Sequence, residues 1–308
     1  MTRGIGESAV VDALPDAAVV AGAAVTTLGD TWFVFVLLAA TYWFLPSRLA
    51  RDPRRSGATL VAIVTGTLAA LTLLKVGIGV PRPPAAASPA PPPDWLPTVL
   101  EGWFAGVTES DGFGFPSGHA TSAAVTYLGL AAVLDKWHGP RTRFFLASIV
   151  VVAVGVSRVV LEVHYLVDIL AGWLLGAALL VAGLALAGNR SSTRRDLDPG
   201  RPFLAAAFVG VLGMLVAFRL GEPESLAIAS AAAGTALGGA VGWGRCEGSE
   251  PPVSIPVAVG AFLVSGPLWL LALTDVVPSV ASAVPAFLAS AIILATPRLS
   301  ERFGDDWW

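Results

Sequence analysis

The amino-acid sequence predicts an all-α protein, a polytopic bundle of transmembrane helices. Three observations predict this class. Hydrophobic residues make up 55% of the chain and charged residues only 13%, whereas soluble domains carry about 25% charged residues. The apolar residues come in long runs that approach the ~20 residues a helix needs to cross a bilayer. The charged residues gather between these runs, where loops meet water.

The apolar runs fall into two groups that a basic segment separates at 188–202. In order, the predicted spans are 30–45, 57–78, 117–134, 144–161, 165–187, 203–220, 225–243, 255–273 and 280–296. The segment 8–28 is also apolar, but Asp12, Pro15 and Asp16 interrupt it, so we expect an interfacial helix or a partial span. The N-terminus does not have the pattern of a removable signal peptide.

The positive charges predict the orientation. Arg and Lys residues are concentrated in the loops after the first, third, fifth, seventh and last runs. If the spans alternate in direction, these loops share one side of the membrane, which the positive-inside rule identifies as the cytoplasm. The opposite side keeps few cations, among them Lys75, Arg82 and Arg158. We therefore expect these three side chains to face the outside of the cell membrane.

The outer loop at 81–115 is long and begins with many prolines. Such a stretch is expected to be stiff and extended, without internal hydrogen bonds. Trp95, Leu96, Trp103 and Phe104 follow, and aromatic side chains of this kind often rest at the level of the lipid headgroups. The loop is interpreted either as a lid or lipid gate, or as a surface segment lying on the membrane.

Other compositional features exclude whole classes of function. The net charge of −3 gives no indication of a nucleic-acid partner. The single cysteine, Cys246, excludes an internal disulfide and a cysteine-rich metal site.

Three polar motifs stand at the ends of the apolar runs. They are Lys75-x-x-x-x-x-x-Arg82-Pro83, Pro116-Ser117-Gly118-His119 and Ser157-Arg158-x-x-x-x-x-His164-x-x-x-Asp168. Placing an ionisable side chain near lipid costs free energy, so such residues are candidates for a functional role. Together the motifs hold two of the three histidines of the chain, one carboxylate and three cations. This set of groups can hold a phosphate and transfer it.

Each motif has a chemical interpretation and an ordinary structural one. His164 and Asp168 share one helix face at i, i+4, so the carboxylate can fix the tautomer of a nucleophilic imidazole, or the two can simply pair at a helix start. In the functional interpretation, Ser117 caps a helix whose first N–H groups bind an anion, and His119 donates a proton. In the structural interpretation, the segment is only a helix cap. The cations at Lys75, Arg82 and Arg158 can bind phosphate or can snorkel to the membrane surface.

In this order the motifs resemble those of the type 2 phosphatidic acid phosphatase superfamily, which includes membrane lipid phosphatases, glucose-6-phosphatase and soluble vanadium-dependent haloperoxidases. The resemblance covers roughly residues 30–187. It implies that His164 attacks phosphorus and forms a phosphohistidine, that Asp168 orients His164, and that His119 protonates the leaving group and then activates water. It also implies that the phosphoryl oxygens are bound by Lys75, Arg82, Ser117, Gly118 and Arg158. With three fixed cations in the site, we expect hydrolysis that needs neither a metal nor a cofactor.

The resemblance gives the predicted organisation of the chain. An N-terminal interfacial or partial span (1–29) precedes a phosphatase core of about five to six helices (30–187), which contains the outer loop. A cytoplasmic basic loop (188–202) leads to a C-terminal extension of about four spans (203–308). Small residues four apart in the stretch 235–242 permit close helix packing, either within the bundle or in a homodimer.

The expected function is a lipid phosphatase in the plasma membrane with its site on the extracytoplasmic side. Phosphatidate, phosphatidylglycerol phosphate and polyprenyl diphosphate are candidate substrates, and the sequence does not choose among them. The alternatives are a phosphotransferase of the same superfamily and a non-enzymatic phospholipid-binding or transport protein.

Overall fold

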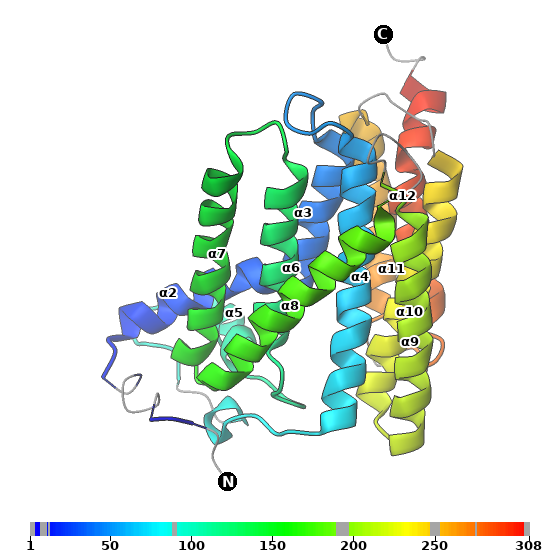
Figure 1. Cartoon of the computed structure of the whole chain (residues 1–308). Coiled ribbons are helices and arrows are strands. Elements are labelled where there is room, and N and C mark those ends of the chain that lie inside the picture. Colours follow the sequence, from blue (N-terminus) through cyan, green and yellow to red (C-terminus); the bar gives the residue numbers. More distant parts are fainter. Residues whose placement is uncertain are drawn as a thin grey trace. The chain divides into compact units, whose positions relative to one another are not determined.

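The computed structural model describes residues 4–6, 11, 13–87, 91–188, 197–246, 253–274 and 276–304, with side chains up to residue 301. Within these ranges the regular elements are all helices, labelled α2 to α12, with two short 3₁₀ helices (Figure 1). The predicted all-α class is therefore confirmed. Asp12, Pro89, Arg190, Arg194, Arg195 and Asp275 lie outside the described residues.

Each predicted span corresponds to one helix. These helices are α3 (Thr31–Phe44), α4 (Pro53–Ile78), α6 (Gly118–Val133), α7 (Pro140–Val160), α8 (Leu166–Ala187), α9 (Gly200–Leu220), α10 (Pro223–Cys246), α11 (Ile255–Leu271) and α12 (Ala283–Gly304). Local sequence signals mark where several of these helices begin or end. α7 begins at Pro140, whose missing N–H costs nothing in a first turn, and α9 ends at Gly221, which adopts the left-handed conformation (φ 71°) that glycine tolerates best.

Fewer helices than expected are long enough to cross a bilayer. In the described part of the chain six helices are long and apolar enough, or seven if the bent pair Asp16–Gly29 and Thr31–Phe44 forms one broken span. α3, α6 and α11 have 14, 16 and 17 residues. At 1.5 Å per residue they are about 21 to 26 Å long, shorter than a hydrocarbon core of about 30 Å.

The ambiguous N-terminal segment forms a short helix and a 3₁₀ turn. α2 (Asp16–Thr26) and η1 (Thr27–Gly29) precede α3, and the chain bends by 49° between η1 and α3. α2 runs across α7 rather than alongside it (Figure 1). A Cβ added at Gly22 would lie 3.2 Å from Val160, so α2 packs closely on the end of α7.

The outer loop is not simply extended, which corrects the expectation from its prolines. It contains η2 (Pro84–Ala87) and an 11-residue helix, α5 (Thr98–Thr108), which packs against α2. Leu96 and Phe104 are buried in a cluster with Ala23, Leu161 and Val163, so they do not rest among lipid headgroups. Trp95 remains exposed. Apolar side chains in the loop therefore serve as a local core that fixes it to α2 and to the third motif.

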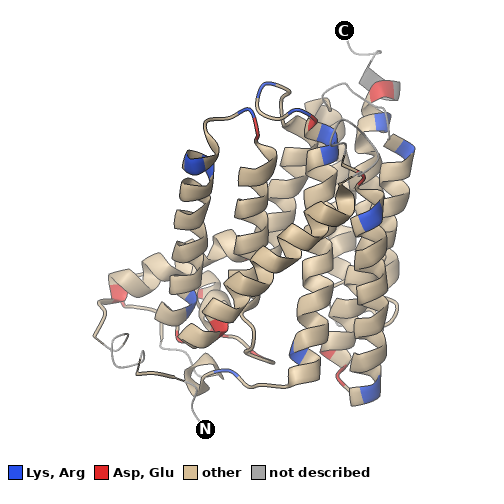
Figure 2. Cartoon of the chain, viewed as in Figure 1, with Lys and Arg blue, Asp and Glu red and all other residues tan. Residues whose placement is uncertain are grey.

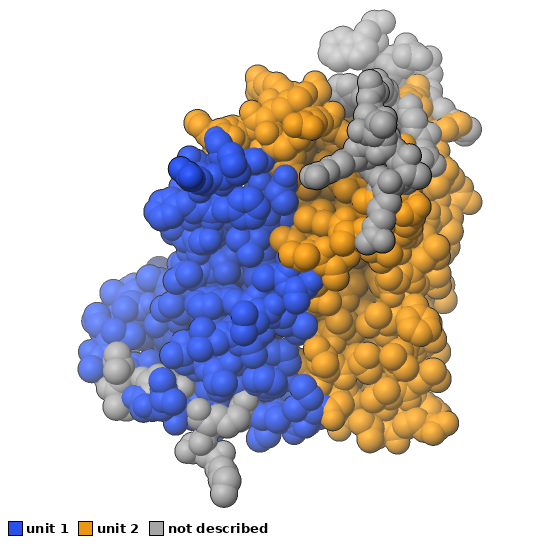
Figure 3. Space-filling view, viewed as in Figure 1, with its two compact units in different colours: residues 1–34, 78–132, 139–178 blue, residues 35–77, 133–138, 179–308 orange. Residues whose placement is uncertain are grey.

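Packing divides the chain into two compact units (Figure 3). Unit 1 contains residues 1–34, 78–132 and 139–178, and unit 2 contains 35–77, 133–138 and 179–308. The boundaries of these units differ from the predicted domain boundaries. The predicted domains stay a prediction.

Small residues bring helices of unit 2 into close contact. A Cβ added at Gly234 or Gly238 would overlap the backbone of Ala283 or Phe287 on α12. A Cβ added at Gly242 would likewise lie 2.7 Å from the carbonyl oxygen of Ala291. This face of α10 is therefore covered by α12 within the chain, as the first of the two interpretations expects, and a homodimer would need another surface. The oligomeric state stays a prediction.

The basic loops meet at one end of unit 2 (Figure 2). Hydrogen bonds and one ion pair join Arg51 to Asp135, Lys136 to the Ser47 carbonyl, Arg55 to the Leu197 carbonyl and Arg298 to the Arg245 carbonyl. These contacts join the loop after the first run to the loops after the third and fifth runs, and the loop after the seventh run to the segment after the last. Lys75 and Arg219 lie in the last turns of α4 and α9, at the opposite ends of those helices from Arg55 and Arg201.

Candidate active site

Asp168 lies in the first turn of α8, and His164 lies in the tight turn between α7 and α8. His164 is thus outside the helix, which corrects the expectation that the two residues share one helix face. The Arg158 carbonyl accepts hydrogen bonds from the N–H groups of Val163 and His164, which closes the turn. His164 Nδ1 lies 3.5 Å from Asp168 Oδ2, and both side chains are almost fully buried. Asp168 Oδ2 also accepts the Tyr165 N–H at 3.0 Å, as a capping carboxylate does. Both interpretations of the pair are therefore compatible, because one carboxylate caps α8 and faces the imidazole.

Arg82 contacts the other nitrogen of His164. Its Nη1 lies 2.9 Å from His164 Nε2, and its Nε and Nη1 also donate to the carbonyls of Asp111 and Val163. A guanidinium has only donors, so Nε2 must be the acceptor and its lone pair points at Arg82. A neutral His164 then carries its proton on Nδ1, the nitrogen that faces Asp168.

The chain brings Arg82 to this position by joining the two ends of the outer loop. Pro81 pairs with Phe113 in an isolated antiparallel bridge, and the Gly114 N–H donates to the Val80 carbonyl at 2.8 Å. A Cβ at Gly114 would lie 2.9 Å from the Arg82 Cα, so only glycine lets the backbones approach this closely.

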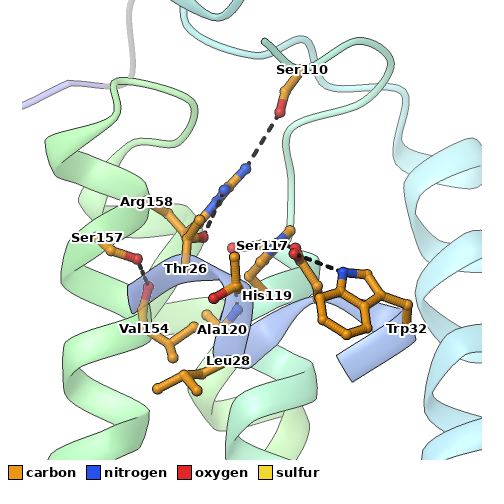
Figure 4. Close-up of polar contacts among 12 residues, drawn as sticks. Thr26, Leu28, Trp32, Ser110, Ser117, His119, Ala120, Val154, Ser157 and Arg158 are labelled. Atoms are coloured by element: carbon orange, nitrogen blue, oxygen red, sulfur yellow. Dashed lines mark hydrogen bonds and ion pairs between the residues drawn. The ribbon is translucent and has the colours of Figure 1, made fainter. Parts of the chain in front are cut away.

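Arg158 lies buried at the end of α7, with 3% of its surface exposed. Its Nη1 donates to Thr26 Oγ1 at 2.8 Å and its Nη2 to Ser110 Oγ at 3.4 Å (Figure 4). Its Nε has no hydrogen-bond partner among the described residues. A buried charged group with an open N–H is suited to binding an anion. The sequence indicated Arg158, but neither Thr26 nor Ser110 carried any signal in the sequence.

The Pro116-Ser117-Gly118-His119 motif begins α6. Ser117 caps this helix, because its Oγ accepts the Ala120 N–H at 3.4 Å. The Ser117 N–H donates to the Asp168 carbonyl at 3.1 Å, which joins the start of α6 to the start of α8. Gly118 is the first residue of the helix, and the first N–H groups of a helix have no partner within it.

His119 pairs with a residue that the sequence did not single out. Its Nε2 lies 2.7 Å from Asp30 Oδ1, and both side chains are partly exposed. Asp30 lies at the bend between η1 and α3. Its position directly before an apolar run is the feature of the sequence that could have indicated a functional role.

The structure places the predicted site residues in different units. Arg82, Ser117, Gly118, His119, Arg158, His164 and Asp168 all belong to unit 1. Lys75 lies in the last turn of α4, within unit 2. Its role as a phosphate ligand, like the catalytic roles of the other residues, stays a prediction.

Comparisons with known proteins agree with the motifs. Residues 56–192 match the family model of the PAP2 superfamily, a shorter stretch than the expected 30–187, and all three motifs lie inside it. Phosphatidylglycerophosphatase B of Bacillus subtilis is 37% identical over 92 residues, which are 28% of this chain and 44% of that protein. The chain thus spans less than half the length of this curated relative. No solved structure matches the chain. With its three motifs in order inside the matched residues, the chain belongs, through residues 56–192, to the PAP2 superfamily, the type 2 phosphatidic acid phosphatases.

Proposed function

We propose that this protein is an integral membrane phosphatase that hydrolyses a lipid phosphate or a polyprenyl diphosphate through a phosphohistidine. The observation that carries the proposal is the environment of His164. Arg82 lies 2.9 Å from Nε2 and Asp168 lies 3.5 Å from Nδ1. This arrangement supports a neutral imidazole with its lone pair on Nε2, which is the form that can attack phosphorus.

In the first step Arg82 donates to a phosphoryl oxygen in place of His164 Nε2, and Nε2 forms a bond to phosphorus while the bond from phosphorus to the leaving oxygen breaks. His119 gives a proton to that oxygen, and the alcohol or phosphate leaves. In the second step His119 takes a proton from water, whose oxygen attacks the phosphohistidine, and inorganic phosphate and neutral His164 are released. Phosphoryl transfer depends mainly on positioning and on neutralising charge at the equatorial oxygens. The proposed ligands for those oxygens are the N–H groups of Lys75, Arg82, Arg158 and Gly118 with the hydroxyl of Ser117.

A lipid substrate is supported by two observations. Lys75, Arg158 and Asp168 lie in terminal turns of the long apolar helices α4, α7 and α8, where a headgroup would lie. The Bacillus subtilis relative is named as a phosphatidylglycerophosphatase. Phosphatidylglycerol phosphate is therefore the first substrate to test, with phosphatidate and a polyprenyl diphosphate beside it.

The test uses the purified full chain in detergent and measures the release of inorganic phosphate. His164→Asn should abolish release from every substrate. His138→Asn is the matched control, because His138 is an exposed histidine with positive φ (46°), a conformation that asparagine tolerates. Alkaline quenching of the unaltered chain should trap a phosphoenzyme that acid destroys, as expected of a phosphohistidine. Equal phosphate release by His164→Asn and the unaltered chain would reject the proposal. Phosphate that passes to added glycerol instead of water would identify a phosphotransferase.

The proposed site faces the outside of the cell, and cysteine labelling tests this orientation. Cys246 is buried, and Cys246→Ser gives a background without cysteine. On this background, Trp95→Cys changes a side chain that is 56% exposed in the outer loop. Arg51→Cys changes one that is 82% exposed in a basic loop. A membrane-impermeant maleimide should label position 95 in intact cells and position 51 only after permeabilisation. The reverse pattern would overturn the orientation.

A further inference from the structure

A carboxylate outside the three motifs holds the second histidine of the site. Asp30 Oδ1 lies 2.7 Å from His119 Nε2. An ionised carboxylate only accepts hydrogen bonds, so Nε2 is the donor in this contact. The other oxygen, Asp30 Oδ2, accepts the indole N–H of Trp32 at 3.3 Å (Figure 4). Both oxygens of Asp30 are therefore engaged, and the carboxylate cannot rotate freely.

The segment that carries Asp30 is fastened to the helices of the site at several points. Thr26 Oγ1 accepts a hydrogen bond from Arg158, and the Leu28 carbonyl accepts one from the Tyr127 hydroxyl at 2.8 Å. A Cβ at Gly29 would lie 2.8 Å from Val154 and 3.2 Å from the His119 ring. The bend between η1 and α3 thus packs directly against the histidine, and a side chain at position 29 would push them apart.

This geometry resembles the carboxylate–imidazole pair at the start of α8 but serves the other histidine. A carboxylate bound to one imidazole nitrogen fixes the ring and offsets the positive charge of its protonated form. Because Nε2 is bound to Asp30, Nδ1 is the nitrogen that exchanges a proton with the leaving oxygen or with water.

We infer that Asp30 is a positioning residue that orients His119 for proton transfer in both steps. The inference rests on the proposed function and extends it beyond the matched residues 56–192. In the first step the phosphorus–oxygen ester bond breaks as the bond from His164 Nε2 to phosphorus forms, and the proton of His119 Nδ1 moves to the leaving oxygen. Asp30 keeps its own charge throughout and acts through its hydrogen bond to His119.

A pair of substrates separates positioning from a merely structural role. One is a long-chain alkyl phosphate, whose alkoxide leaves only if it is protonated. The other is a nitrophenyl phosphate with an alkyl chain of the same length, whose nitrophenolate leaves without a proton. The measured quantity is kcat/KM, which reports the step that expels the leaving group and not the later hydrolysis of the phosphoenzyme. Asp30→Asn should lower kcat/KM for the alkyl phosphate by roughly 10- to 100-fold, less than the 10²- to 10⁴-fold of a general acid as a whole, because His119 itself remains. For the nitrophenyl phosphate the loss should stay below about 3-fold.

A double variant gives the second readout. His119→Ala removes the group that Asp30 acts through, so adding Asp30→Asn to it should change kcat/KM for the alkyl phosphate by less than about 2-fold. Asp16→Asn is the matched control, because Asp16 is exposed at the start of α2, and it should leave both substrates unaffected. Should Asp30→Asn fail to fold, Asp30→Glu keeps the charge and should lose activity selectively on the alkyl phosphate.

The possible failures are distinguishable. Equal losses on both substrates, or full additivity in the double variant, would overturn the inference while leaving the proposed function intact. Undiminished hydrolysis by His164→Asn would instead reject the proposed function.

Discussion

Gly172→Ala tests whether close packing between α6 and α8 sets the geometry of the site. Gly172 lies on α8 one turn after Asp168. A Cβ added there would lie 2.8 Å from the Ser117 carbonyl oxygen and 2.9 Å from the Ala120 Cβ. The carbonyl cannot swing away, because it accepts hydrogen bonds from the Thr121 N–H at 3.1 Å and the Thr121 hydroxyl at 2.8 Å. The start of α6 must therefore move away from the start of α8.

The distances at Gly172 set the expected loss of stability and of rate. An ordinary contact begins near 3.4 Å, so α6 must shift by about half an ångström at Ser117. Overpacking costs about 1 to 3 kcal/mol, and alanine regains about 1 kcal/mol of helix propensity. The net loss of stability is then about 0 to 2 kcal/mol. A displacement of ~1 Å can cost 10²-fold in rate, so half of that should lower kcat/KM by about 10-fold.

Two measurements in detergent check this prediction: kcat/KM for a lipid phosphate and the thermal unfolding midpoint. Gly260→Ala in α11 is the control, because nothing lies within 4 Å of its added Cβ: kcat/KM should be preserved, and the thermal midpoint should stay the same or rise slightly with the gain in helix propensity. The reasoning is refuted if Gly172→Ala keeps kcat/KM within about 2-fold of the unaltered chain, since a rate that tolerates the shift does not depend on this contact.

Three further predictions concern the site and the bundle. Asp168→Asn should lower kcat by about 10² to 10⁴-fold, because an amide does not fix the tautomer of His164; it should leave the thermal midpoint nearly unchanged, since the amide oxygen of asparagine can still accept the Tyr165 N–H. Arg158→Lys should lower kcat/KM by about 10-fold or more, because one ammonium cannot bond Thr26, Ser110 and a phosphoryl oxygen in the geometry of a guanidinium; a rate equal to that of the unaltered chain would contradict this role. Phosphate release should persist in a chelator of divalent ions, because Arg82 and Arg158 supply fixed positive charge, and a release that stops until Mg²⁺ is restored would show that a metal is needed.

The sequence by itself predicted most of the helices and proposed the residues of the candidate site. The apolar runs predicted α3 to α12 except α5, because a helix that meets lipid needs apolar side chains on every exposed face. The cap at Ser117 and the proximity of His164 to Asp168 were also predictable, since both contacts join residues close in the chain at the start of a helix. The sequence did not show that His164 lies outside α8. Span lengths were overestimated for α3, α6 and α11, because hydropathy does not mark where a helix stops hydrogen bonding.

Only the tertiary structure decided which distant groups meet. The partner of His119 is Asp30, 89 residues away in the chain, and no periodicity relates the two. Phe104 and Leu96 belong to a buried cluster although the prolines around them indicated an extended loop, because the apolar residues of α2 and of the turn at Leu161 offer them a place away from solvent. The small residues of α10 lie against α12. The sequence shows that these residues permit close packing, but only the arrangement of the helices decides which surface packs against them.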